Sequence, residues 1–169
     1  SKTLANKSGT GEPPGDQFQS LLNLYKQGQY QEALDQGSEL LEQFPNSINL
    51  YNILGAVNQE LGKIEKAIEA YKKAISIKPD FVEAYNNMGI ALKEQGKLEE
   101  AIEAYARAIY IKPDYTEAYN NKGITLKDQG RHDQALEAFN AAISLKPEFA
   151  EAYNNMGTVL KEQGKNDQA

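Results

Sequence analysis

The side chains of this chain that could act as nucleophiles, bases or metal ligands are few and scattered. The 169 residues include one histidine, His132, and no cysteine. A nucleophile–base pair and a thiolate or multi-histidine metal site both need several such groups together. The adjacent carboxylates Glu99 and Glu100 are typical of a solvated helix face. We therefore expect a structural role for His132, no enzymatic activity, and no metal or other cofactor.

Amide side chains form a more regular pattern, in the pairs Asn86-Asn87, Asn120-Asn121 and Asn154-Asn155. An amide both donates and accepts hydrogen bonds, so a row of amides can hold an extended peptide backbone independently of its sequence. Asparagine is also a poor helix former, which makes its place in the middle of a predicted helix notable. Two interpretations remain open: the pairs contact a ligand, or they only bridge neighbouring repeats.

The elements that position these amides follow from a period of 34 residues. Residues that keep this step are Gly55, Gly89, Gly123 and Gly157; Gly28, Gly62, Gly96, Gly130 and Gly164; Ala33, Ala67, Ala101, Ala135 and Ala169; and Pro45, Pro79, Pro113 and Pro147. Self-similarity at a fixed period is the sequence signature of a repeat architecture.

Each unit reads as two helices. Apolar or small residues at i, i+3, i+4 and i+7 predict one helix over residues 81–95 and a second over 98–111. Gly96 separates the two helices and Pro113 cannot extend the second. The pattern Asp80…Glu83 predicts a capping box before the first helix, which repeats at 114…117 and, more weakly, at 148…151.

Glycine inside a helix costs about 1 kcal/mol relative to alanine, so a row of glycines in register predicts close helix packing. We expect the glycines at 55, 89 and 123 to face Ala67, Ala101 and Ala135 on the second helices.

This spacing resembles the tetratricopeptide repeat family, whose pattern is carried by Tyr85, Met88-Gly89, Leu92, Ala101, Tyr105, Ala108 and Pro113. The resemblance implies an all-α fold of tandem antiparallel helical hairpins, stacked as a right-handed superhelix. In such arrays the first helix of each hairpin lines the concave wall. The asparagine pairs resemble the asparagine ladder in the repeat domain of O-linked N-acetylglucosamine transferases.

The repeat period divides the chain into a flexible leader (1–15) and an array (16–169), with repeats at about 14–47, 48–81, 82–115, 116–149 and a partial one at 150–169. The first repeat is degenerate, and Phe18, Leu21, Leu22 and Tyr25 predict a rotated first helix. The last helix, predicted over 150–163, lacks its hairpin partner. Either the natural chain continues, or this apolar face pairs with another molecule.

The predicted concave wall is the side of each first helix that lies opposite its core face. The residues predicted to bind peptide there are Asn52, Ala56, Asn86, Asn87, Ile90, Lys93, Asn120, Asn121, Ile124, Lys127, Asn154, Asn155 and Thr158. We interpret the apolar row of Ala56, Ile90 and Ile124 as an interface. The glutamates at 83, 117 and 151 are assigned instead to the capping boxes.

Charge and hydropathy exclude several partner classes. The net charge is −6 and no long basic run is present, which argues against nucleic-acid binding. No apolar stretch approaches the ~20 residues of a membrane span, and the cytoplasm is the default location. The wall lacks the Lys and Arg of a carboxylate clamp, so we expect no binding of the acidic C-termini of Hsp70 and Hsp90.

These observations predict a protein–protein interaction scaffold that binds an extended peptide or partner segment in its concave groove. Two alternatives remain. The unfinished last repeat suggests a self-assembly module that forms homo-oligomers. Family analogy alone suggests a non-catalytic accessory domain of a larger enzyme, such as a glycosyltransferase or sulfotransferase.

Overall fold

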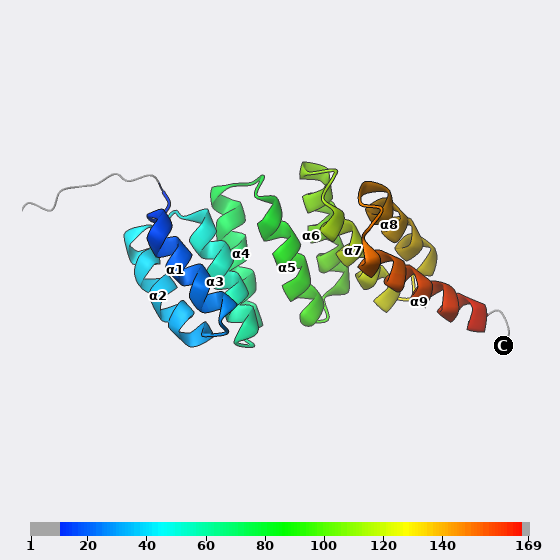
Figure 1. The fold of residues 1–169 in the computed structure, drawn as a ribbon, viewed down its shortest axis with the longest axis horizontal. Helices are drawn as coiled ribbons and strands as arrows, with labels where there is room; N and C mark the ends of the chain where they lie inside the picture. Colours follow the sequence, from blue (N-terminus) through cyan, green and yellow to red (C-terminus); the bar gives the residue numbers. More distant parts are fainter. Residues whose placement is uncertain (1–10, 167–169) are drawn as a thin grey trace, which may run out of the picture. The chain divides into compact units, whose positions relative to one another are not determined.

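The computed structural model describes residues 11–166, and this part of the chain forms nine α-helices and no strand (Figure 1). The chain divides into two compact units, residues 1–79 and 80–169. The first unit contains α1 (Gly15–Lys26), α2 (Tyr30–Gln43), α3 (Ile48–Glu60) and α4 (Ile64–Ile77). The second contains α5 (Val82–Glu94), α6 (Leu98–Ile111), α7 (Thr116–Asp128), α8 (His132–Leu145) and α9 (Ala150–Asn166). The predicted all-α helical-repeat fold is confirmed.

Consecutive helices pair as hairpins, α1 with α2, α3 with α4, α5 with α6 and α7 with α8. Each hairpin turns at a glycine with positive φ: Gly28 (74°), Gly62 (71°), Gly96 (77°) and Gly130 (73°). Other L-residues would lose about 1–2 kcal/mol in this conformation. After α5, the Lys97 N–H donates to Leu92 O (2.9 Å), so the turn also satisfies a carbonyl at the helix end.

The same turn sequence does not end α9. Residues 93–97 and 161–165 are both Lys-Glu-Gln-Gly-Lys, yet α9 continues to Asn166 and Gly164 remains helical. The predicted end of this helix at residue 163 is therefore wrong. The turn after α5 leads into α6, which packs back on α5, whereas no described helix follows α9. The glycine permits the turn, but the returning helix stabilises it.

Aromatic rings provide the atoms nearest to the in-register glycines. A Cβ atom built on Gly89 would lie 2.5 Å from Cε1 of Tyr105, and one on Gly123 would lie 2.6 Å from Cε1 of Phe139. Gly55 has the same relation to Tyr71, at 2.4 Å. The atoms nearest to these glycines thus come from the rings and not from the expected partners Ala67, Ala101 and Ala135, which are fully buried on the same second helices. The glycine is needed because a flat ring lies directly on the helix backbone.

In the first hairpin the small and the large residue of this contact exchange helices. Leu21 stands where later repeats have the glycine, and Gly37 stands where they have the aromatic ring. A Cβ atom on Gly37 would lie 2.6 Å from Cδ2 of Leu54 and 3.4 Å from Cδ2 of Leu21. The degenerate repeat thus keeps close helix packing with the small residue moved to its second helix.

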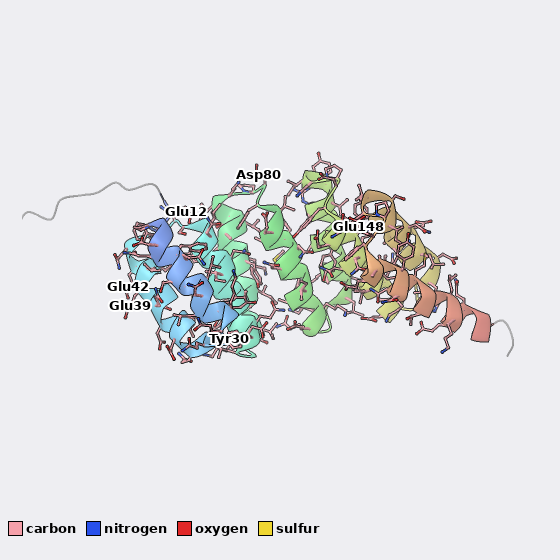
Figure 2. All side chains as sticks on the ribbon, viewed as in Figure 1. Glu12, Tyr30, Glu39, Glu42, Asp80 and Glu148 are labelled. Carbon is pink, nitrogen blue, oxygen red and sulfur yellow. The ribbon has the colours of Figure 1, made fainter. Side chains whose placement is uncertain are left out.

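The helix starts differ from the predicted capping boxes. Phe81 and Tyr115 are the N-cap residues of α5 and α7, and neither helix has a side-chain cap hydrogen bond. Asp80 and Glu148 are exposed in the turns before α5 and α9 (Figure 2). The turn after each second helix is one residue longer than the capping-box assignment required. The predicted boxes, with residues 80 and 114 as N-caps, therefore do not form at α5 and α7.

Helix α3 has a side-chain N-cap, and Glu12 of the predicted flexible leader takes part in it. Ser47 is the N-cap and its Oγ accepts from the Leu50 N–H at 3.0 Å. Ser47 Oγ also donates to the carboxylate of Glu12, which accepts from the Ile48 N–H at 2.9 Å. Figure 2 marks Glu12 just before α1. A carboxylate at a helix N-terminus is favoured by the helix dipole. Residues 11–15 are thus ordered against α3, and residues 1–10 lie outside the described residues.

Each unit has its own hydrophobic cluster. In the first unit it is formed by Leu21, Ala33, Leu40, Leu50, Ile53 and Val57. In the second it is formed by Ile102, Leu126, Ala135, Ala138, Phe139, Ala142, Ala152 and Val159. Phe18, Leu22 and Tyr25 pack against the first cluster, as a rotated α1 requires.

Candidate functional site

The asparagine pairs of the second unit form a hydrogen-bonded relay across its first helices. Helices α5, α7 and α9 are neighbours. Asn121 Nδ2 donates to Asn86 Oδ1 at 3.0 Å, and Asn155 Nδ2 donates to Asn120 Oδ1 at 3.1 Å. Asn120 Nδ2 in turn donates to Glu151 Oε1 at 2.9 Å. The second asparagine of each repeat is therefore bonded to the first asparagine of the repeat before it.

The two members of a pair lie in different environments. Asn86 and Asn120 are buried, with 5% and 2% of their surface exposed, whereas Asn121 and Asn155 are half-buried. Asn154, which has no repeat after it in the described chain, is exposed. The sequence placed Asn86 and Asn120 at the edge of the wall, but the structure places them inside the packing between helices. Only the second amide of each pair reaches the surface.

The relay leaves part of each surface amide unused. Asn121 and Asn155 each donate one N–H to a buried asparagine of the preceding repeat. Among the side chains described, those of residues 11–164, no donor reaches Oδ1 of either amide. An amide has two donor hydrogens and an acceptor oxygen, so each retains one N–H and its Oδ1 for another molecule. The buried asparagine holds the surface amide in one orientation.

The two predicted wall lysines of the second unit converge on one carboxylate. Lys93 Nζ lies 3.1 Å from Asp128 Oδ2, and Lys127 Nζ lies 3.6 Å from Asp128 Oδ1. All three side chains are partly exposed, so each pair contributes about 1 kcal/mol or less. The edge of the wall is accordingly close to charge balance.

The apolar row, predicted to lie on the wall and not in the core, is partly buried in the second unit. Ile124 is half-buried and packs against the cluster of the second unit, and Ile90 is also half-buried. Thr158, the next member along α9, is exposed and its Oγ1 donates to Asn154 O at 3.0 Å. The row therefore offers small apolar patches between the amides.

Two of the predicted residues lie outside the second unit. Asn52 and Ala56 lie half-buried on α3, in the first unit. Asn87 lies half-buried on α5 in the second unit, and both Asn52 and Asn87 have interaction partners. The structure thus brings together the predicted residues of α5, α7 and α9.

Sequence reasoning missed two polar contacts of α7. Glu151 was assigned to a capping box, although it accepts from Asn120 across the repeat boundary. Thr125 is fully buried and shares a hydrogen bond with Tyr105 of α6. Burial raises the pKa of the Tyr105 phenol well above its ordinary value, and Glu94 adds to the rise. A buried threonine where the next repeat has Val159 was the available signal.

His132 sits at the first turn of α8, with its Nδ1 4.0 Å from Oε2 of Glu162. Its side chain is 20% exposed. Over residues 11–166 no three His, Asp or Glu side chains gather as a metal site would require. Within the same range, no helix combines the length and apolarity needed to cross a membrane.

Comparison with known families and structures identifies the repeat. Tetratricopeptide repeat models match residues 80–148 and 138–169, and a further model, described as TPR repeat, matches residues 60–96. A search of curated proteins finds no match.

Several solved structures share the fold. A crystal structure of MamA is 30% identical over 86% of this chain and 85% of that chain, with a TM-score of 0.76. The Pseudomonas aeruginosa pilF structure is 24% identical over 89% of this chain and 68% of that chain, with a TM-score of 0.81. The first TPR of Spaghetti (RPAP3), solved with the HSP90 peptide SRMEEVD, is 20% identical over 69% and 93%, with a TM-score of 0.67. The 34-residue period, the hairpins in which an aromatic ring packs on a helical glycine, and these matches together show that this chain belongs to the tetratricopeptide repeat family.

Proposed function

We propose that this protein is an interaction scaffold that binds an extended peptide along α5, α7 and α9. The observation that carries the proposal is the relay, because it presents Asn121 and Asn155 at the surface with unused hydrogen-bonding groups. These two residues are one repeat apart, so their amides form a regular row.

An extended backbone is the ligand that suits such a row. Its N–H and C=O groups alternate, and an oriented amide can accept from one and donate to another. The buried partners, Asn86 and Asn120, fix the amides before the ligand arrives, which lowers the entropic cost of binding. The half-buried Ile90 and Ile124 provide apolar contact beside the amides. Affinity would then depend on the backbone more than on the side-chain sequence.

Charge disfavours an acidic C-terminus on this wall. The RPAP3 repeat domain binds an HSP90 peptide that ends in EEVD. Here Lys93 and Lys127 already share Asp128, and the remaining relay residues are neutral apart from Glu151. We therefore infer that Hsp70 and Hsp90 C-termini are not the ligands of this surface.

Replacement of the surface amides tests the proposal. A peptide selected from a random dodecapeptide library would be titrated against the wild-type chain and the Asn87→Ala/Asn121→Ala/Asn155→Ala variant. We expect at least about a tenfold loss of affinity, since two or more hydrogen bonds of about 0.5–1.5 kcal/mol each are lost. Asn154→Ala, at an exposed amide on the same helix, is the matched control and should bind normally. Equal affinity of the triple variant and the wild type would disprove the groove model.

Self-assembly is a second candidate, favoured by the open face of α9. Tyr153 and Leu160 are 44% and 50% exposed, although they occupy apolar positions of the repeat. A second copy could cover this face. Sedimentation velocity over a wide concentration range would detect the association, and Leu160→Lys should abolish it. A monomer at the highest concentration would exclude this function.

A further inference from the structure

The first unit contains a groove between α2 and α4 whose floor is α3. It has a volume of about 620 Å³ and is lined by Leu34, Leu41, Tyr51, Leu54, Asn58 and Ala70 inside, with Lys66, Lys72 and Lys73 among the residues at its rim. Small-molecule and peptide side-chain sites commonly have volumes of about 300–1,000 Å³. None of its lining residues belongs to the amide row of α5, α7 and α9, so the two sites are separate.

An equivalent groove in the second unit shows what is unusual here. Eight of its lining residues lie two repeats after a lining residue of the first groove: Ile102, Tyr119, Lys122, Leu126, Gln134, Glu137, Ala138 and Ala141. Arg131 also lines it and has no counterpart among the lining residues of the first groove. The volume of the equivalent groove is only about 290 Å³. Four positions change character between the two sites: Leu54 becomes Lys122, Asn58 becomes Leu126, Lys66 becomes Gln134 and Lys73 becomes Ala141.

Asn58 is the most informative of these differences. The other repeats have leucine at this position, at residues 24, 92, 126 and 160. Asn58 is only 7% exposed, and while its Nδ2 donates to Leu54 O at 2.8 Å, its Oδ1 has no hydrogen-bond partner. An unsatisfied buried acceptor costs about 1–3 kcal/mol. A polar residue that weakens the fold at a leucine position indicates a use for the free oxygen.

The rim is basic in an acidic protein. The chain has a net charge of −6, yet three lysines and one glutamate, Glu69, line this groove. In the described part of the chain no carboxylate lies within 4 Å of Lys66 or Lys73. Both lysines are exposed, and they are seven residues apart on α4, which places them on one face about two turns from each other. They can therefore meet two negative charges of one ligand.

We propose that this groove binds a short acidic peptide segment that carries a bulky apolar side chain. The apolar side chain packs on Leu34 and Leu54, and the carboxylates of the segment meet Lys66 and Lys73. One N–H group of the segment donates to Asn58 Oδ1, which is buried in the free protein and becomes accessible when the segment binds. The free acceptor selects a peptide over a fatty-acid anion, because an ionised fatty acid has no hydrogen-bond donor. This binding is independent of the amide row of the proposed function.

Fluorescence anisotropy with labelled peptides tests the proposal. The peptide DDLFDD should bind the wild-type chain, whereas DDAADD, without the apolar group, and KKLFKK, with reversed charge, should not. Decanoate, which has the apolar body and the charge but no donor, should bind more weakly. Binding of decanoate without binding of DDLFDD would overturn the peptide assignment, and so would equal binding of DDLFDD and KKLFKK.

Two variants locate the site. Lys66→Glu/Lys73→Glu should weaken DDLFDD binding at least about tenfold through charge repulsion. Asn58→Leu should weaken it by up to about tenfold through loss of one hydrogen bond, while raising the Tm because it restores the core leucine. If Asn58 had only a structural role, a variant with a raised Tm would not show weaker binding of DDLFDD. Unchanged affinity in both variants would overturn the proposal.

Matched controls come from the equivalent groove and the amide row. Gln134→Glu/Ala141→Glu places the same charges two repeats away and should leave DDLFDD binding unchanged. Asn87→Ala/Asn121→Ala/Asn155→Ala should also leave it unchanged. If this triple variant lost both DDLFDD and the selected dodecapeptide, the two peptides would share the amide row, and the separate groove site would be refuted.

Discussion

Helices α7 and α9 have closely related sequences and a similar preceding neighbour, yet only α7 is enclosed. Residues 117–121 and 151–155 are both Glu-Ala-Tyr-Asn-Asn. Helix α7 packs on α6 and α8, and α9 packs on α8 and α7, but in the described chain no hairpin partner follows α9. Leu126 is 2% exposed and the equivalent Leu160 is 50% exposed. The same residues are core or surface according to whether the next helix is present.

The glycines and amides follow the same rule. Gly123 is buried against the ring of Phe139, whereas a Cβ atom on Gly157 would meet nothing within 4 Å. Asn120 is buried in the relay and Asn154 is exposed. The burial of a repeat residue therefore depends on whether a neighbouring helix packs on it. This is expected for an architecture whose stability comes from interfaces between adjacent repeats.

Truncation of the two leucines should give the largest contrast. We expect Leu126→Ala to lower the free energy of unfolding by about 2–5 kcal/mol, as for a fully buried leucine. Leu160→Ala should lower it by about 1 kcal/mol or less, because half of that side chain is already in water. Urea denaturation followed by circular dichroism measures both. Equal losses would mean that α9 is covered in solution, most simply by a second copy.

The glycines should respond with opposite signs. Gly123→Ala should destabilise the protein by about 1–3 kcal/mol, because the new methyl group overlaps the Phe139 ring. Gly157→Ala should stabilise α9 by up to about 1 kcal/mol, since alanine is the better helix former and the site is open. The midpoint of urea unfolding would be compared for both. A loss of stability in Gly157→Ala would contradict an open α9 face.

Removal of the amides should have a smaller but still unequal effect. Asn120→Ala should cost about 1–2 kcal/mol, because it takes away the acceptor of Asn155 and a donor to Glu151. Asn154→Ala should change stability by no more than about 0.5 kcal/mol, as for an ordinary surface substitution. Thermal unfolding of the two single variants decides the point. Comparable costs would show that the relay does not join the repeats energetically.

Alkaline pH should destabilise the interface between α6 and α7 more than the interface between α8 and α9. Near neutral pH it should have little effect on either. The pair Tyr105 and Thr125 lies between α6 and α7, and its equivalent between α8 and α9 is Phe139 and Val159. Since burial raises the Tyr105 pKa, the folded state holds this proton more tightly than the unfolded state, whose tyrosine pKa is about 10. The stabilisation is complete below about pH 10 and is lost as the pH rises above it.

The double variant Tyr105→Phe/Thr125→Val copies the later interface and should reduce this alkaline loss. Urea unfolding at about pH 8 and about pH 11 would compare it with the wild type. Tyr25 and Tyr115 also have raised pKa values through burial, so part of the loss should persist. An unchanged pH dependence would exclude Tyr105 as a contributor.

The sequence alone determined the architecture of this protein. The 34-residue period, the helical spacing of apolar residues and the glycines of positive φ predicted the hairpins and most of their boundaries, because these signals are local and recur in every repeat. It also singled out the asparagine pairs, since an amide in the middle of a helix is unfavourable without a partner. The fourfold recurrence of leucine at the position of Asn58 was equally visible, although its meaning was not.

Only the tertiary structure decided which of these residues are accessible. Asn86 and Asn121 belong to different repeats, and which of them is buried depends on how α5 packs on α7. Gly96 and Gly164 stand in the same pentapeptide, but within the described residues a returning helix follows only the first. Contacts between residues about 30 positions apart depend on the placement of whole helices, and no local pattern of side chains encodes that placement.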